Sequence, residues 1–434
     1  MTPARLHADA DAGLWSDTAP EPPATPPIRG AHDSDIAVIG AGYTGLSAAL
    51  HAAAAGANVT VLEAAAPGHG GSGRNVGLVN AGLWLMPDAL EARLGPDRGG
   101  RLLAALGDGP ALVWDIIARH RIDCEATANG TLHCAPDAAG LRALRARTAQ
   151  WHRRGAPVVM LDAGETAARI GATAFRGALL DRSAGTVQPL GYARGLARAA
   201  IAAGAKVHGH SPVLSLRRDR DRWELATPQG SLRAARVIVA TNTYSAGPCA
   251  DLRRAQSVLP YFNIATKPLP APQRATILPG AEGCWDTHKV LTSFRLDAAG
   301  RLILGSVGAL GPLDRAAHEA WARRRLAGLF PALADLAFEH AWYGRIGTTP
   351  DALPRFNRHG TGMWSISGYN GRGIAPGTVF GRMLAQLALD RIAPDAIPLP
   401  LIDAPPRPDP LRHLREPVWR AGSAALHLAG ARRG

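Results

Sequence analysis

The sequence predicts an α/β fold in two domains, and three observations support this prediction. The chain has 434 residues, more than a single hydrophobic core usually serves. Two runs of β-branched and apolar residues, 35–40 and 237–240, are typical of strands buried in a parallel sheet. Residues 46–55, which follow the first run, are helix-forming and end at a glycine. This alternation of strand and helix predicts a parallel sheet covered by helices.

The first strand opens a nucleotide-binding motif. In the turn that follows it, Gly40 permits the sharp bend, Gly42 lets the backbone approach a pyrophosphate, and Gly45 lets helix and strand pack closely. The helix N-terminus offers N–H groups and a favourable dipole to the phosphates. A second strand, 59–62, ends at Glu63, where a carboxylate would accept ribose hydroxyls. The predicted dinucleotide contacts of this Rossmann-type unit are Gly40, Gly42, Tyr43, Thr44, Gly45 and Glu63.

A second glycine-rich run, 68–77, comes directly after the acidic strand end. A simple NAD-binding unit places its next crossover here, whereas a flavin needs additional backbone close to its ribityl chain and ring. The run therefore favours FAD, and no second dinucleotide motif follows, since 305–308 lacks the turn spacing. Electrons are then expected to pass from the substrate to the flavin and on to oxygen or a carrier. The expected contacts in this run are Gly71, Ser72, Gly73, Arg74, Asn75 and Gly77.

The composition predicts a globular chain with a basic surface. Hydrophobic residues make up 47% and charged residues 19%, and the formal charge is +13. Such a charge attracts nucleic acid, but the excess is almost entirely arginine and is scattered rather than gathered in runs. We therefore expect a solvated basic surface and no nucleic-acid partner.

The cysteines and the apolar segments indicate a cytoplasmic protein. Four cysteines without any C-x-x-C spacing fit a reducing compartment, and no metal site is expected. The first twenty residues contain no apolar segment, so no secretory signal is predicted. Glycines interrupt the apolar stretch 36–62, which argues against an integral membrane segment.

With these motifs in this order, the sequence resembles the D-amino-acid-oxidase-type FAD oxidoreductases over residues 15–389, and within them the gamma-glutamylputrescine oxidase-like branch. Besides the two glycine runs, the resemblance rests on the segments 14–20, 239–244, 264–269, 294–305, 330–331, 341–344 and 368–373. Two departures stand out. Gly71 and Val76 replace residues usual in the second run, and Arg372 stands where the late motif tends to carry His.

The resemblance implies a Rossmann-type, GR2-like FAD-binding domain interleaved with an α+β substrate domain built on an antiparallel sheet. On this basis the FAD-binding domain is expected at 34–90, 155–253 and 340–395, the substrate domain at 91–154 and 254–339, a lead-in at 1–33 and a tail at 396–434. Arg74, Asn75 and the cysteine-free surroundings of 349–351 replace the residues that attach flavin covalently in some relatives, so FAD is expected to bind non-covalently. The resemblance also implies that the backbone of Val213 contacts adenine, and the loop after the strand 237–240 adds Ala240, Thr241 and Asn242.

The late glycine motif is expected to serve the chemistry. It leads into a helical run, 378–390, whose N-terminus would stabilise negative charge on the reduced ring. The predicted reaction is oxidation of the C–N bond of a small amine or amino-acid-like substrate to an imine. Arg345 and Arg372 could clamp a substrate carboxylate, and Tyr369 could line the pocket. The ring contacts expected here are Gly371, Arg372, Gly373 and Ile374.

Three alternative functions remain open on the sequence. A tRNA-modifying flavoenzyme or a non-catalytic FAD-binding protein would keep the same motifs. An NAD-dependent dehydrogenase would keep the first motif, but it would not need the second glycine run.

Overall fold

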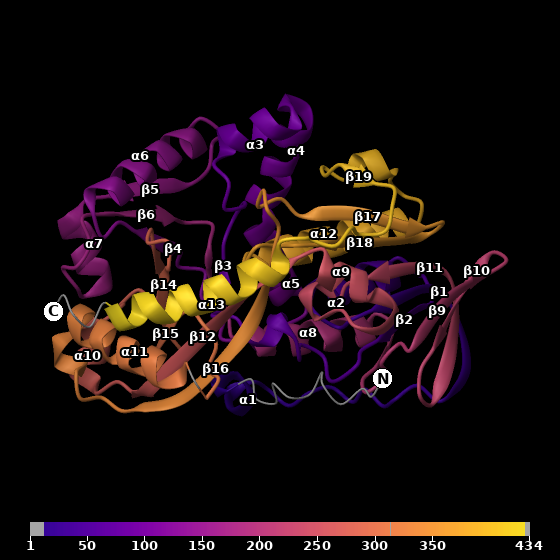
Figure 1. The fold of residues 1–434 in the computed structure, drawn as a ribbon, viewed down its shortest axis with the longest axis horizontal. Helices are drawn as coiled ribbons and strands as arrows, with labels where there is room; N and C mark the ends of the chain where they lie inside the picture. The colour runs from indigo at the N-terminus through magenta and orange to yellow at the C-terminus, as the bar shows by residue number, and fades with distance from the viewer. Residues whose placement is uncertain (1–12, 313, 430–434) are drawn as a thin grey trace.

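The computed structural model describes residues 13–312 and 314–429. Residues 1–12 of the predicted lead-in and 430–434 of the predicted tail lie outside the described residues. Two large sheets organise the described chain, one at each end of the molecule in the view of Figure 1.

The first sheet is the predicted parallel nucleotide-binding sheet. Its main path runs β19-β17-β18-β11-β1-β2-β8, with β10 and β9 added antiparallel at β11. From β18 to β8 neighbouring strands are parallel, as expected for strands that are covered on both faces. The strands are β1 (Gly30–Ile39), β2 (Val59–Leu62), β8 (Lys206–His208), β9 (Ser215–Asp219), β10 (Arg222–Ala226), β11 (Gly230–Val239), β17 (Arg355–Gly360), β18 (Met363–Ser367) and β19 (Leu401–Ile402).

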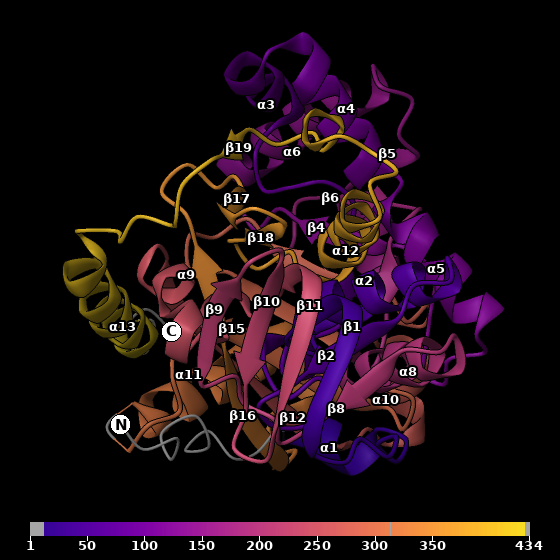
Figure 2. The same ribbon diagram turned by 90° about the vertical axis from the view of Figure 1, so that its right-hand side faces the viewer.

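Helices pack over this sheet and bury its apolar face. Leu46 and Phe380, from the two central helices, are fully buried in the main hydrophobic core. Figure 2 shows the strands in front and these helices beside them. The central helices are α2 (Tyr43–Ala54), α8 (Pro189–Ala202) and α12 (Ile374–Ala388), and short helices α1 (Leu14–Thr18) and α9 (Ala250–Arg254) lie at the margin. A further helical segment packs on α12 and consists of α3 (Pro87–Leu94), α4 (Pro96–Gly107) and α5 (Gly109–Arg119).

The second sheet has the order β16-β12-β15-β14-β13-β4-β6-β5 and is antiparallel except at β13 and β4. Its strands are β4 (Thr131–Cys134), β5 (Val158–Leu161), β6 (Ala178–Asp181), β12 (Ser257–Pro268), β13 (Gly283–Asp286), β14 (Thr292–Leu296), β15 (Arg301–Val307) and β16 (Phe338–Thr348). Its helices are α6 (Ala138–His152), α7 (Ala163–Ile170), α10 (Ala271–Thr276), α11 (Arg315–Leu329) and α13 (Arg412–Ala429). A small sheet of β3 (Leu78–Val79) and β7 (Gly185–Thr186) stands apart.

The strand pairing moves three segments from the first predicted domain to the second sheet. Strands β5 and β6 fall in the range 155–253 expected for FAD binding, but β6 pairs with β4 and β5. Strand β16, most of which falls in the range 340–395, pairs with β12. Tertiary packing decides which sheet a short apolar strand joins, and the local sequence of the strand does not indicate it.

The predicted tail is partly buried. Ile397 and Leu399 are buried, and β19 pairs with β17. The helix α13, which the sequence interpretation did not include, lies along β12 and α11 (Figure 1).

Candidate functional site

The first glycine turn has the geometry that the motif predicts. Gly40 has φ +101°, a conformation that favours glycine. A Cβ added at Gly45 would lie 2.0 Å from the carbonyl oxygen of Gly40, so only glycine lets α2 pack this closely on β1. A Cβ at Gly42 would lie 2.9 Å from Ser72 Oγ, which faces it from the second glycine run. The two runs therefore meet at Gly42.

Glu63 closes β2 with its carboxylate held in place by backbone N–H groups. Oε2 accepts from Ala41 N at 2.7 Å and Oε1 accepts from Ala65 N at 3.0 Å. Burial raises the pKa of Glu63, and these hydrogen bonds oppose the rise. Each oxygen keeps a lone pair that could accept a ribose hydroxyl.

The second glycine run is fixed by hydrogen bonds among its own residues. Ser72 Oγ accepts from Tyr43 N at 3.1 Å, and the Tyr43 hydroxyl donates to the Ser72 carbonyl. Asn75 Nδ2 lies 3.0 Å from the carbonyl oxygens of Gly71 and Ser72, and Asn75 Oδ1 accepts from Gly77 N. Asn75 thus shapes the loop that lines the cavity.

The lead-in helix and β16 support this loop from behind. Trp15 is fully buried, and its Nε1 donates to the Asn75 carbonyl at 2.9 Å. The Arg74 carbonyl accepts from Trp342 Nε1 at 3.1 Å and Asn263 Nδ2 at 3.2 Å. Arg74 Nε donates to the carbonyl of His69 at 2.9 Å, so its side chain is held against the loop.

A single cavity of about 1190 Å³ joins the predicted contacts. It runs past Glu63 and Val213, the two glycine runs, and the loop 240–242 to the start of α12. Gly45, Gly73 and Gly77 do not line it. They are positions of close packing, where an added Cβ would lie within 2.3 Å of a backbone carbonyl oxygen. The remaining predicted contacts line the cavity: Gly40, Gly42, Tyr43, Thr44, Glu63, Gly71, Ser72, Arg74, Asn75, Val213, Ala240, Thr241, Asn242, Arg345, Tyr369, Gly371, Arg372, Gly373 and Ile374.

The start of α12 faces the cavity, one turn earlier than the expected helical run 378–390. Gly373 is the N-cap without a side-chain cap, and Ile374 begins the helix. Gly371, with φ +87°, and Asn370, with φ +54°, turn the chain into it. Asn370 Oδ1 accepts from Thr349 N at 2.8 Å, which anchors the turn to the end of β16. The helix therefore directs uncapped N–H groups and the positive end of its dipole toward the cavity.

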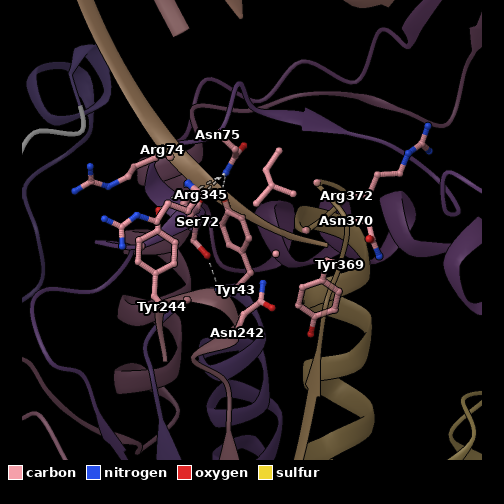
Figure 3. A pocket seen from close by; sticks show the side chains of 18 of the residues that line it. Tyr43, Ser72, Arg74, Asn75, Asn242, Tyr244, Arg345, Tyr369, Asn370 and Arg372 are labelled. Carbon is pink, nitrogen blue, oxygen red and sulfur yellow. Dashed lines mark hydrogen bonds between the residues drawn. The ribbon is translucent and has the colours of Figure 1, made fainter. Parts of the chain in front are cut away.

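The structure gives Tyr369 a packing role instead of a reactive one. Its hydroxyl lies 2.8 Å from Thr44 Oγ1 and 3.2 Å from the carbonyl oxygen of Ile366. Its ring stacks on Phe380 of α12, and burial raises the pKa of the hydroxyl. Figure 3 shows the hydroxyl directed away from Arg372.

The two candidate arginines lie on opposite sides of the cavity (Figure 3). Arg345 lies beside Tyr244, with its guanidinium carbon 5.9 Å from the ring centre, and the backbone N–H of Arg345 donates to the Tyr244 hydroxyl at 3.0 Å. Arg372 is buried against Trp84 and donates from Nη1 to the carbonyl of Ala81 at 2.7 Å. The two guanidinium groups do not form a joint clamp.

These residues fit FAD. The cavity exceeds the roughly 300–1,000 Å³ of a site for one drug-sized ligand, so it has room for a dinucleotide and a substrate. Gly42 lines the cavity, and the N-termini of α2 and α12 both border it. The carboxylate of Glu63 completes the donor and acceptor set for a ribose and a pyrophosphate.

A profile of the FAD-dependent oxidoreductase family, DAO, matches residues 35–387. The chain belongs to this family. It is 31% identical over 379 residues to the probable oxidoreductase OrdL of Rhizobium meliloti, covering 86% of this chain and 87% of OrdL. It is 32% identical to gamma-glutamylputrescine oxidoreductase of Escherichia coli over 81% of this chain and 83% of that protein. Glycine oxidase from Geobacillus kaustophilus has the same fold, with a TM-score of 0.67 and 22% identity over 84% of this chain and 96% of that chain.

Membership of the DAO family confirms the predicted FAD-dependent oxidoreductase with non-covalently bound FAD. The NAD-dependent and the non-catalytic alternatives are therefore wrong. Most relatives whose names specify a substrate are named for amines or amino acids, in agreement with the predicted oxidation of a C–N bond. One relative, 27% identical, is named for tRNA 5-methylaminomethyl-2-thiouridine biosynthesis. No helix among the described residues is long and apolar enough to cross a membrane.

The sequence interpretation missed one side of this DAO-family cavity. Trp84, Arg147 and Trp285 line it opposite the glycine runs, and His133 stacks on Trp285 at 4.8 Å. No motif marks these positions, because they come from a loop, a helix and two strands that only the fold brings together. Tyr261 and His288 also line the cavity.

Proposed function

We propose that this DAO-family enzyme oxidises the C–N bond of an amine that carries a carboxylate, with electrons passing to oxygen or a carrier. The observation that carries the proposal is the buried guanidinium of Arg372, which lines the cavity within one residue of the N-cap of α12. A carboxylate bound there would hold the neighbouring part of the substrate against the start of that helix.

Bound FAD supplies the two-electron oxidant that turns the C–N single bond of an amine into an imine. The protein supplies position and charge. The loop 71–77 and Tyr43 set the floor of the cavity, and the N-terminus of α12 offers positive potential where negative charge develops. We assign no general base, because alignment of the substrate accounts for much of the rate in such a site.

Arg372 is the better carboxylate ligand of the two candidates. It presents its guanidinium inside the aromatic part of the cavity, whereas Arg345 lies beside Tyr244 on the side of Arg74 (Figure 3). A charge-assisted contact in a site shielded from water is also stronger than one in an open site.

The distribution of charge on the surface favours a small-molecule substrate over RNA as the partner. Many arginines form ion pairs with Asp or Glu, including Arg101 with Asp97 and Arg358 with Asp403, so part of the positive charge has an acidic neighbour. The four cysteines are free and buried, which supports our placement of the enzyme in the cytoplasm.

The test is anaerobic reduction of the flavin by matched pairs of an amino acid and its decarboxylated amine. We expect the amino acid to reduce the flavin faster. Arg372→Ala should raise the substrate constant roughly ten- to a hundredfold, the loss expected for one charge-assisted contact. Arg345→Ala should have a smaller effect, and Arg145→Ala, an exposed position on α6, should have none.

Faster reduction by the decarboxylated amines throughout would overturn the carboxylate preference. Oxygen uptake during turnover, compared with reduction of an artificial acceptor dye, separates an oxidase from a dehydrogenase.

A further inference from the structure

The helix α13 carries most of the large apolar side chains that the described residues expose. Of eight such side chains, five lie on α13 or directly before it: Leu411, Leu414, Val418, Leu426 and Leu428. Each of the five exposes between 47% and 67% of its surface. The residues between them on this outer face are small and also exposed, namely Ala421, Gly422 and Ala425. A contiguous exposed apolar face marks an interaction site, whereas a single exposed apolar residue needs no explanation.

The opposite face of α13 docks on the protein through polar contacts. Oε1 of Glu416 accepts from the N–H of Val258 at the start of β12, at 2.9 Å. Arg324 of α11 donates from Nη2 to the carbonyl of His427 at 2.6 Å. Figure 2 shows α13 at the edge of the molecule. The helix is therefore held by its inner face, and its apolar outer face is available to a partner.

Positive charge borders this apolar face. Arg415 pairs with Asp409, and the arginine exposes 31% of its side chain whereas the aspartate exposes 7%. Arg420 is likewise more exposed than its partner Asp314. Solvent at the edges of the face therefore meets guanidinium groups, and two more arginines, at 432 and 433, follow the helix in the sequence. An apolar face bordered by arginines is typical of helices that lie in the interface of a membrane.

A second copy of the chain fits this face less well than a membrane does. The helix has 18 residues. Its outer face is therefore roughly 27 Å long and about 10 Å wide, and it offers about a third of the roughly 800 Å² that each partner buries in a standard interface. Two copies, each with a formal charge of +13, also repel each other, whereas the same charge attracts the chain to an anionic bilayer.

We infer that α13 is an interfacial helix that docks this enzyme on the surface of an anionic lipid bilayer. Leu414 and Val418, at the middle of the outer face, enter the boundary between head groups and acyl chains, and Arg415 and Arg420 contact lipid phosphates. The helix stays docked along β12 and α11 and lies on the membrane. It follows residues 35–387, which the family profile matches, so the inference concerns this chain and not the DAO family as a whole. It is independent of the substrate and of the proposed reaction.

The test is co-sedimentation of the full-length, FAD-loaded enzyme with lipid vesicles. One set of vesicles contains equal parts of phosphatidylglycerol and phosphatidylcholine, and the other contains phosphatidylcholine alone. We expect the partition coefficient to be at least roughly tenfold higher for the anionic vesicles and to fall as salt is added.

Variants of the outer face test which residues bind the vesicles. Leu414→Ser combined with Val418→Ser should lower the partition coefficient on anionic vesicles by roughly tenfold or more, because two apolar side chains no longer leave water. The matched control is Ile201→Ser combined with Ile402→Ser, which removes two exposed apolar side chains from α8 and β19. This control should bind the vesicles as the wild type does.

Flavin content and melting temperature show whether each variant keeps its fold. Should the variant at 414 and 418 not fold, Leu426→Ser combined with Leu428→Ser decides at the other end of the face. Unchanged vesicle binding in a folded α13 variant, or no binding by the wild type, would overturn the inference. A wild-type dimer in lipid-free sedimentation that the same substitutions dissociate would also overturn it, because a second copy then covers the face. Equal binding to both kinds of vesicle would contradict the role of the arginines and of an anionic surface.

Discussion

Two glycines of one turn are constrained by different neighbours. An added Cβ at Gly45 meets backbone, the carbonyl oxygen of Gly40 at 2.0 Å, and neither atom can move without shifting β1 or α2. At Gly42 an added Cβ meets only the side chain of Ser72, whose Oγ would lose its hydrogen bond from Tyr43 N on moving aside, and no backbone atom lies within 4 Å. Gly45 is therefore needed for the fold of the apo-protein, whereas Gly42 is needed for what the cavity binds.

This difference predicts two separable phenotypes. Gly45→Ala should lower the free energy of unfolding of the apo-protein by about 1–3 kcal/mol, the usual cost of overpacking. Gly42→Ala should leave the apo-protein stable and weaken FAD binding, because a methyl group there faces the pyrophosphate. Denaturant unfolding and FAD titration measure the two effects. Gly100→Ala on α4, where an added Cβ meets nothing within 4 Å, is the control. Normal FAD affinity in Gly42→Ala would remove the predicted role of Gly42.

The sequence locates glycines better than it locates arginines. A glycine in a motif reports a local backbone requirement, so the positions 40, 42 and 45 could be interpreted from spacing alone. A guanidinium reaches far, and its partner is set by the fold. Arg345 and Arg372 follow similar motifs but lie on opposite sides of the cavity, and Arg147 comes from a helix with no motif at all.

At the scale of elements, the sequence predicted the first strand, helix and second strand of the nucleotide-binding unit, but it did not predict the C-terminal helix. The predicted strand 35–40, helix 46–55 and strand 59–62 correspond to β1, α2 and β2. The helix α13 contains Pro417, and it exposes 67% of Leu414 and 66% of Val418 while burying His427. Its apolar residues thus point outward, so the periodicity that usually reveals a packed helix is reversed.

The buried His427 makes the docking of α13 sensitive to acid. Its Nδ1 lies 2.8 Å from Nδ1 of His318, and its ring stacks on Trp321 with ring centres 4.4 Å apart. Burial, followed by His318 and Arg324, lowers the pKa of His427 to about 3. A lowered histidine pKa contributes stability that is complete above the unfolded value of about 6.5 and is lost as the pH falls toward the folded value.

We therefore expect the free energy of unfolding to fall by about 2 kcal/mol through His427 between pH 6.5 and 5, from a slope of about 1.4 kcal/mol per pH unit. Denaturant unfolding over this range measures the slope. His427→Gln should start less stable but show a shallower slope, and the exposed His413→Gln on the same helix should match the wild type. Equal slopes in all three proteins would show that His427 does not titrate in this way.

At the scale of the whole molecule, the chain passes between the two sheets several times, and the cavity lies where they meet. Its lining draws on β1, β2 and α12 from the first sheet and on β13, β14 and β16 from the second. The resemblance implied this interleaving, but the sheet assignment of β5, β6 and β16 depended on pairings between distant segments. Local sequence does not show which distant strands will pair. For this reason the side of the cavity lined by Trp84, Arg147 and Trp285 was not predicted.

A cofactor in this position should stabilise both sheets together. A ligand that binds only the folded state adds about 2.7 kcal/mol at a free concentration one hundred times its Kd, so the melting temperature of the apo-protein should rise steadily with added FAD. NAD⁺ at the same concentrations should cause a much smaller rise, since it shares the ADP half of FAD but has no flavin for the second glycine run and the α12 turn to bind. Because the bond to the protein is non-covalent, acid precipitation of the loaded enzyme should leave all flavin in the supernatant. A melting temperature that ignores FAD concentration, or flavin that sediments with the protein, would contradict this account, and an equal response to NAD⁺ would reassign the role of residues 68–77. A single transition that shifts as a whole would show that the two sheets unfold as one unit around the cofactor, as a cavity lined from both requires.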